Sequence, residues 1–225
     1  MRKLFLTRTT SSHRGQSAED VFINREFPKN YKGFFVDVGC FHPYKYNNTY
    51  GLYKRGWRGV NIDIDAIKIE GFNMVRSRDT NIQRAVSQQA GELTYYTNGF
   101  YSLVVTLNED FTKERPKYDY RPASVQADTL THILDSTTYQ NRQIDFLTVD
   151  AEGYDLAVLQ SLDFDRYRPR LIAVEIQATT LDDVLADELY RFLMARGYQL
   201  VNWVGQTLMF RLTTEVSNPC PLKTA

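Results

Sequence analysis

The chain has 225 residues, of which 43% are hydrophobic and 24% are charged, and this composition is typical of one globular domain with a full core. Its 27 Lys and Arg residues balance its 27 Asp and Glu residues, which argues against a dedicated nucleic-acid-binding protein. The two cysteines, Cys40 and Cys220, lie far apart and form no zinc motif. No apolar stretch has the length of a transmembrane helix or of a signal-peptide core, so we expect a soluble cytoplasmic protein.

The first 30 residues are expected to form an arm followed by one helix. Ser17 is a suitable N-cap, Glu19 and Asp20 occupy the first turn, and Pro28 ends the helix. On local evidence, the two acids complement the positive end of the helix dipole.

The stretch from Phe34 to Asp65 reads as strand, loop, helix and strand. The apolar run at 34–38 predicts a buried strand, a short helix is expected at 48–53, and Val60-Asn61-Ile62-Asp63 predicts a second strand. Two parallel strands joined by such a crossover form half of a nucleotide-binding unit, and ligands bind beyond the carboxyl ends of its strands.

Three residues are expected at that edge: Asp37, Gly39 and Asp63. A loop that binds pyrophosphate carries three glycines and no negative charge, whereas this loop has one glycine and an aspartate. The aspartate suits a ligand with positive charge, such as S-adenosylmethionine (SAM), which carries an ammonium and a sulfonium group. Asp63 is placed to accept hydrogen bonds from ribose hydroxyls, as the acid does in dinucleotide folds. The alternative is that both acids only cap or solvate the strand ends.

The middle of the chain is expected to continue with a helix at 66–75 and a third strand at 81–87. Small residues at a strand end admit a flat ring, so Ala85, Val86 and Ser87 are candidates to border an adenine.

A β-hairpin is predicted over 92–97 and 101–106, around Asn98-Gly99. Residues 107–122 are polar and show no periodicity, which indicates a substrate loop or lid, or else a surface excursion. A short strand is predicted at 124–128.

Two later strands end in acids. The strand predicted at 144–149 leads directly into three acids within six residues, which are Asp150, Glu152 and Asp155. Such a group is costly unless a helix N-terminus, a metal, a cationic ligand or a substrate proton compensates for it. The strand predicted at 170–177 carries a lone acid, Glu175, near its end.

The last part of the chain predicts one helix with its apolar face between Leu181 and Leu193, ended by Gly197. Two strands at 198–204 and 207–212 are expected to pair antiparallel. The alternation of helices and strands predicts an α/β fold.

Several motifs, taken in order, resemble those of the FkbM family of SAM-dependent methyltransferases. They are V-D-V-G-C-F-H-P-Y-K-Y-N-N-T-Y, Y-K-R-G-W-R-G-V-N-I-D, A-V-S, V-Q-A-D-T-L and I-D-F-L-T-V-D-A-E-G-Y-D, with Q-S-A-E-D near the N-terminus. The ordered set spans roughly residues 14–212. Asn47 stands where serine is common in the family, and Cys40-Phe41 replaces smaller or more polar residues.

The resemblance implies a class I methyltransferase fold of the Rossmann-like type, with a mostly parallel seven-stranded sheet and a C-terminal antiparallel strand. It also implies O-methylation, often of a sugar hydroxyl in a glycan or a natural product. The methyltransferase domain would span residues 31–215, between the N-terminal segment 1–30 and a tail at 216–225. The positions that the resemblance assigns to SAM are Asp37, Gly39, Asn48, Thr49, Asp63, Ala85, Val86, Ser87 and Asp150.

The resemblance places His42, Asp150 and Glu152 on the acceptor side. A hydroxyl becomes a good nucleophile only when a base takes its proton, and histidine has a pKa near neutrality. His42 is therefore the first candidate for the base, and its alternative role is to order the loop beside Pro43. Asp150 and Glu152 are rival bases or acceptor-binding groups.

A metal-assisted reaction is a variant in which Asp150 and Glu175 share a divalent cation such as magnesium. We expect no essential metal, because His42 offers a base.

Two alternatives from other functional classes are an NAD-dependent oxidoreductase and a catalytically silent glycan-binding domain. The expected partner is a sugar or glycan acceptor, with no nucleic acid and no membrane span, and the sequence does not indicate an oligomeric state.

Overall fold

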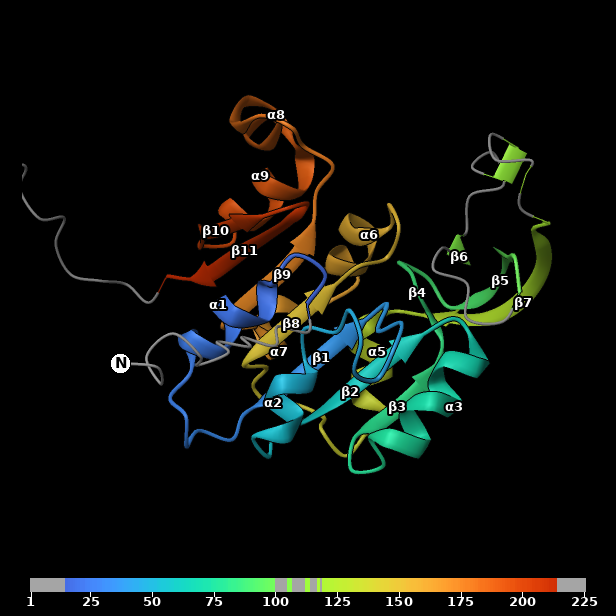
Figure 1. Ribbon diagram of the computed structural model, residues 1–225. Coiled ribbons are helices and arrows are strands. Elements are labelled where there is room, and N and C mark those ends of the chain that lie inside the picture. Colours follow the sequence, from blue (N-terminus) through green and yellow to red (C-terminus); the bar gives the residue numbers. More distant parts are fainter. Residues whose placement is uncertain (1–14, 100–104, 107–111, 114–116, 118, 214–225) are drawn as a thin grey trace, which may run out of the picture.

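A computed structural model describes residues 15–99, 105–106, 112–113, 117 and 119–213 (Figure 1). A seven-stranded sheet forms its centre, in the order β10-β11-β9-β8-β1-β2-β3. Its strands are β1 (Phe34–Val38), β2 (Arg58–Asp63), β3 (Thr80–Gln83), β8 (Phe146–Val149), β9 (Leu171–Glu175), β10 (Tyr198–Val204) and β11 (Thr207–Leu212). All its neighbouring strands pair in parallel except those that involve β11, which lies antiparallel between β9 and β10. This order confirms the expected class I methyltransferase fold.

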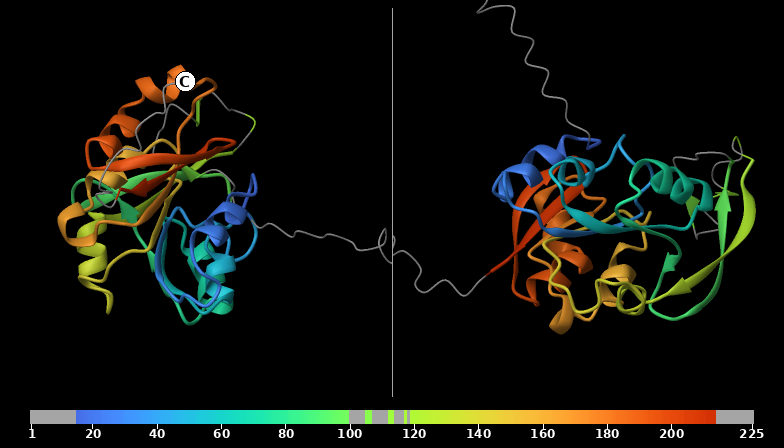
Figure 2. Two further views of the ribbon diagram at one scale, coloured as in Figure 1. Left: turned by 90° about the vertical axis from the view of Figure 1, so that its left-hand side faces the viewer. Right: turned by 90° about the horizontal axis from the view of Figure 1, so that it is seen from below.

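Helices cover both faces of this sheet (Figures 1 and 2). Their bounds are α1 (Glu19–Glu26), α2 (Tyr50–Lys54), α3 (Ala66–Val75), α5 (Leu130–Asp135), α6 (Asp155–Gln160), α7 (Phe164–Tyr167), α8 (Leu181–Ala186) and α9 (Glu188–Met194). The larger core joins one face of the sheet to α5, α6 and α9, and a second core joins the other face to α1 and α2. Both cores are apolar, so the central strands are buried on two sides, as expected for parallel sheets.

The strand β1 shows how this burial follows from the sequence. All five of its residues are buried. Because successive side chains of a strand point to opposite faces, Phe34 and Val36 enter the larger core and Phe35 enters the second. Asp37 therefore lies on the Phe35 side of the sheet, toward α2.

A second, four-stranded sheet extends away from the β3 side of the first (Figure 1). Its strands, in the order β4-β7-β5-β6, are β4 (Ala85–Val86), β5 (Gly91–Thr97), β6 (Val105–Thr106) and β7 (Arg121–Asp128). The antiparallel pairing of β5 with β6 confirms the predicted hairpin, although residues 101–104 lie outside the described part. Most of the predicted loop at 107–122 also lies outside it, and residues 121–122 belong to β7.

The prediction of a single strand at 81–87 is wrong. The chain forms two strands instead, β3 in the large sheet and β4 in the small one, with Arg84 between them. The backbone N–H of Arg84 donates to the carbonyl of Asp63, and β4 then pairs with β7. No glycine or proline marks this switch, which explains why the sequence reads as one strand.

Two predictions about helices also need correction. The helix expected between Leu181 and Leu193 is interrupted at Asp187, whose carboxylate accepts hydrogen bonds from Leu189 N and Tyr190 N and begins α9. An aspartate competes with helix continuation through such local bonds.

Ser17 is not the N-cap of α1, because Ala18 occupies that position with a left-handed backbone. Instead, the backbone N–H of Ser17 donates to Glu19 Oε2 at 2.9 Å. Both Glu19 and Asp20 are buried, so their role exceeds the expected interaction with the helix dipole.

Gly59 of β2 is paired with Phe35 of β1 and leaves room for its ring. A Cβ atom at this position would lie 2.1 Å from Cε2 of Phe35, which is itself fully buried. The absence of a side chain at this position is therefore a packing requirement of the second core.

We expect Gly59→Ala to lower the free energy of unfolding by about 1–3 kcal/mol, the usual cost of overpacking a core. Chemical unfolding measures this directly. Phe35→Leu serves as the partner in a double-mutant cycle, because a smaller side chain relieves the clash and makes the two changes strongly non-additive. Additive effects would show that the clash is not the cause.

Candidate active site

A cavity of about 280 Å³ opens at the carboxyl ends of β1, β2 and β8. Its wall includes Gly39 from the loop after β1, Asp63 at the end of β2, and Ala85 and Val86 of β4. Asp150, which follows β8, also lines it, next to Gly39. The topology thus brings together residues that are more than a hundred positions apart in the sequence.

Gly39 brings the chain close to β8. It has a positive φ of 75°, and a Cβ atom would lie 1.8 Å from the carbonyl oxygen of Asp150. Its backbone N–H donates to the carbonyl of Ile62, as does that of Cys40. A residue with a side chain is excluded here, both by backbone strain and by space.

Asp63 is buried and firmly oriented. Its Oδ1 accepts from Asp65 N at 2.9 Å, its Oδ2 accepts from Phe41 N at 3.1 Å, and Lys68 Nζ lies 3.8 Å from Oδ2. Burial raises the pKa of Asp63, and the ammonium of Lys68 opposes that change. The carboxylate faces the cavity in an orientation fixed by backbone donors.

Asp37 is not among the residues that line the cavity. Its Oδ2 accepts from Thr49 Oγ1 at 2.7 Å and from Asn47 Nδ2 at 3.2 Å. Thr49, the N-cap of α2, is fully buried and also lies outside the cavity wall. Asp37 and Thr49, which were predicted to contact SAM, therefore support the loop through a hydrogen bond and do not line the cavity.

Arg76, at the end of α3, completes this support. Its guanidinium is fully buried, pairs with Asp79 at 2.9 Å and donates to Thr49 Oγ1 at 2.8 Å and Asn47 Oδ1 at 3.1 Å. Burial raises the pKa of Asp37 to about 6, although Arg76 and the hydrogen bonds oppose that change.

The cavity wall also carries Asp150 and Glu152. The Asp150 carboxyl is open to the cavity, yet it is hydrogen-bonded to Glu175 at the end of β9. Burial, followed by the charges of Glu175 and Glu152, raises the pKa of Asp150 well above its ordinary value. Burial also raises the pKa of Glu175. Asp150 and Glu175, which were predicted to be neighbours, are thus in direct contact.

A smaller hollow of about 60 Å³ adjoins this pair. It shares Gln16, Tyr46 and Asp150 with the larger cavity and adds Glu175 and Gln206 among others. Asn48, expected to contact SAM, lines this smaller hollow and not the larger one.

His42 does not line either hollow. Its Nδ1 lies 3.2 Å from Tyr44 N and 3.1 Å from Lys45 N, and both backbone groups donate to it. A ring nitrogen that accepts must carry a lone pair, so the proton of the neutral ring resides on Nε2. Burial, followed by the charge of Lys45, lowers the pKa of His42. This geometry matches the loop-ordering alternative.

Ser87 also stays outside the cavity. Its backbone N–H donates to the carbonyl of Asp128, and its hydroxyl donates to the carbonyl of Gln89. The small residues that do reach the cavity are Ala85 and Val86.

Several cavity residues were not predicted from the sequence, among them Gln16, Tyr46, Lys68 and Arg84. A signal existed for Lys68, because it falls in the first turn of the helix that follows Asp63. Gln16 begins the Q-S-A-E-D motif of the N-terminal segment, for which no place at the cavity was predicted from the sequence. Arg84 occupies the unexpected switch between the two sheets.

Two kinds of feature are absent from the described residues. No group of three or more His, Cys, Asp or Glu side chains there has an arrangement suited to a metal ion. No helix in that part of the chain has the length and apolar character needed to cross a lipid bilayer.

Residues 37–200 match the methyltransferase FkbM domain, so the chain belongs to that family of methyltransferases. No protein with a curated function matches it in sequence. A solved TehB-like SAM-dependent methyltransferase from Corynebacterium glutamicum is similar at 13% identity and a TM-score of 0.45, with 87% of each chain covered. The N-terminal domain of human METTL16, solved in complex with SAH, is similar at 11% identity and a TM-score of 0.40, over 87% of this chain and 67% of that one.

The buried network predicts a pH-dependent stability. Because the pKa of Asp37 rises from 3.8 to about 6 on folding, its stabilising contribution is present below about pH 4 and is lost as the pH rises through 6. At about 1.4 kcal/mol per pKa unit, the loss is on the order of 3 kcal/mol. We expect Asp37→Asn to remove this component from the pH profile of the unfolding free energy.

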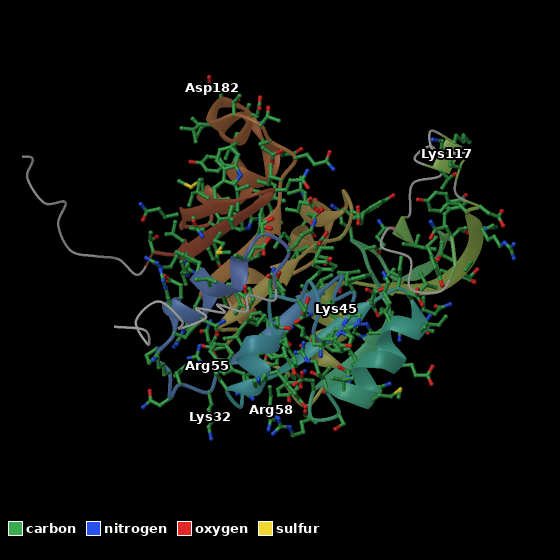
Figure 3. The ribbon with its side chains drawn as sticks, in the orientation of Figure 1. Lys32, Lys45, Arg55, Arg58, Lys117 and Asp182 are labelled. Carbon is green, nitrogen blue, oxygen red and sulfur yellow. The ribbon has the colours of Figure 1, made fainter. Side chains whose placement is uncertain are left out.

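The control for this measurement is Asp182→Asn, since Asp182 is an exposed carboxylate on α8 (Figure 3) and does not line the cavity. Its profile should follow that of the parent protein. Parallel profiles for the Asp37→Asn variant and the parent would contradict the buried titration.

Proposed function

We propose that this domain transfers the methyl group of SAM to a hydroxyl of a sugar or glycan. The observation that supports this proposal best is the set of side chains gathered around one cavity at the sheet edge. Its wall combines an oriented aspartate and small residues with Asp150, whose carboxyl is hydrogen-bonded to Glu175. Family membership supports methyl transfer as the reaction.

Four residues of the cavity wall fit SAM chemically. Gly39 lets a ligand approach the backbone closely, and Asp63 offers a fixed acceptor for ribose hydroxyls. Ala85 and Val86 provide a small apolar border for adenine. When bound, SAM supplies an electrophilic methyl group, and the protein must hold it and exclude water.

The acceptor proton is best assigned to Asp150. Asp150 lines both hollows, so its carboxyl can reach an acceptor hydroxyl in either of them. Asp150 is hydrogen-bonded to Glu175, and burial with the charges of Glu175 and Glu152 raises its pKa, which brings this carboxyl closer to the basicity that a general base needs near neutral pH. Glu152, on the same wall, is assigned to acceptor binding.

A hydroxylated acceptor is favoured by the smaller hollow. Its wall carries amide and hydroxyl groups, including those of Gln16, Asn48, Gln206 and Thr207. Such groups both donate and accept hydrogen bonds, as sugar hydroxyls do. Within the described residues, the buried Oδ1 of Asn48 has no hydrogen-bond partner, and a purely apolar acceptor would leave it so.

The direct test is a methyl-transfer screen with labelled SAM over a panel of sugars and glycans, together with calorimetry of SAH binding. Transfer to a hydroxyl of a sugar is the expected result. Binding of SAH without transfer to any sugar would overturn the acceptor class. Binding of a nicotinamide cofactor in place of SAH would favour the oxidoreductase alternative, and binding of glycan without turnover would favour the silent domain.

We expect Asp150→Asn to lower turnover by roughly 10²–10⁴, the usual range for loss of a general base. His42→Ala should act on loop order instead, so its main effect should be weaker SAH binding. Turnover at saturating SAM and the SAH dissociation constant separate these two outcomes. A large loss of turnover in His42→Ala with unchanged SAH affinity would return the base role to His42.

Metal dependence is tested by chelation. We expect the activity to persist after treatment with a chelator, because the proposed base is a carboxyl pair and needs no metal-bound hydroxyl. Activity is measured before treatment, after it, and after addition of magnesium. Complete loss followed by recovery with magnesium would assign Asp150 and Glu175 as metal ligands.

A further inference from the structure

Lys68 lies on the wall of the larger cavity, in the first turn of α3. Its side chain is only 5% exposed, and Nζ lies 3.8 Å from Asp63 Oδ2 and 5.0 Å from the centre of the Phe41 ring. Within the part of the chain that the structure describes, the ammonium makes the ion pair and the ring contact but no hydrogen bond.

This arrangement leaves the ammonium under-satisfied. An ammonium has three N–H donors, and burying it without acceptors is costly. A separation of 3.8 Å from a carboxylate gives Coulomb attraction, but it exceeds the length of a hydrogen bond. The open space beside Lys68 is the cavity itself, so a ligand with oxygen acceptors would complete its surroundings.

Asp63 narrows the chemistry of that ligand. A phosphate next to Lys68 would be repelled by the carboxylate, and a carbonyl would satisfy the lysine alone. A hydroxyl group both donates and accepts, so it can donate to Asp63 and accept from Lys68 at once. Two adjacent hydroxyls match this donor and acceptor pair best.

We propose that Lys68 and Asp63 together recognise the ribose diol of SAM, with Lys68 donating to a hydroxyl oxygen. This inference rests on the proposed SAM-dependent function. Lys68 is then a cofactor-binding residue that selects ribose over its deoxy forms, and it works beside the acid expected at the end of β2.

A purely structural role for Lys68 is distinguishable. Asp63 is already held by the backbone N–H groups of Phe41 and Asp65, so its orientation does not depend on the lysine. Replacing Lys68 by methionine keeps an apolar stem against the Phe41 ring and removes only the ammonium. The effect of this change should therefore depend on the hydroxyls of the ligand.

The experiment is calorimetry with SAH and with its 2′,3′-dideoxy analogue, on the parent, Lys68→Met and a control, Lys32→Met. Lys32 is exposed. Figure 3 shows it well away from Lys45, which belongs to the loop after β1 that borders the cavity. We expect Lys68→Met to weaken SAH binding roughly 10- to 100-fold, as loss of a charge-assisted hydrogen bond implies. The dideoxy analogue should bind the parent and Lys68→Met equally, and Lys32→Met should match the parent with both ligands.

Unchanged SAH affinity in Lys68→Met would overturn the proposal, as would an equal loss for both ligands. If the methionine variant does not fold, Lys68→Gln carries the same test, because it retains a neutral donor and should lose less affinity. A parent protein that binds SAH normally while Lys68→Met is unaffected refutes the lysine role alone. A parent that binds no SAH at all refutes the proposed function.

Discussion

A guanidinium without exposed surface supports the loop that borders the cavity. Removing a charge from water is costly, and the cost is offset only when nearly every donor has a partner. In Arg76, Nε and Nη1 donate to Asp79, Asn47 and Thr49, whereas Nη2 lies 2.9 Å from the Asp79 carboxylate without a hydrogen bond within the described part of the chain. The guanidinium also lies against the rings of Phe35 and two other aromatic residues at 5.0–5.2 Å.

The burial of Arg76 also determines how the loop after β1 is held at the sheet edge. Asn47 and Thr49 in turn hold the carboxylate of Asp37, so β1, the loop after it and the end of α3 are joined through one cation. Gly39 and Phe41, which border the cavity, belong to this loop. The shape of the cavity therefore depends on a network that no ligand has to touch.

The sequence predicted most of the scaffold, because its strands are short apolar runs that end in acids or glycine. It also predicted the location of Asp63 and Asp150, since the carboxyl ends of parallel strands meet at one edge. It did not predict that Asp37 faces away from the cavity, because that follows from the pleat and from a partner, Arg76, far along the chain. The positions of Lys68 and Gln16 on the cavity wall were not predicted for the same reason, because they depend on tertiary contacts.

The thiol of Cys40 gives the cavity loop a natural reporter. Cys40 is buried, and burial raises the pKa of its thiol well above the ordinary value, so the folded loop holds it as an unreactive thiol. Its carbonyl accepts from Asn47, which ties it to the network of Arg76. Reaction of this thiol with an alkylating reagent therefore requires the loop to open, so the labelling rate of Cys40 reports the rate of loop opening. A ligand that keeps the loop closed lowers that rate.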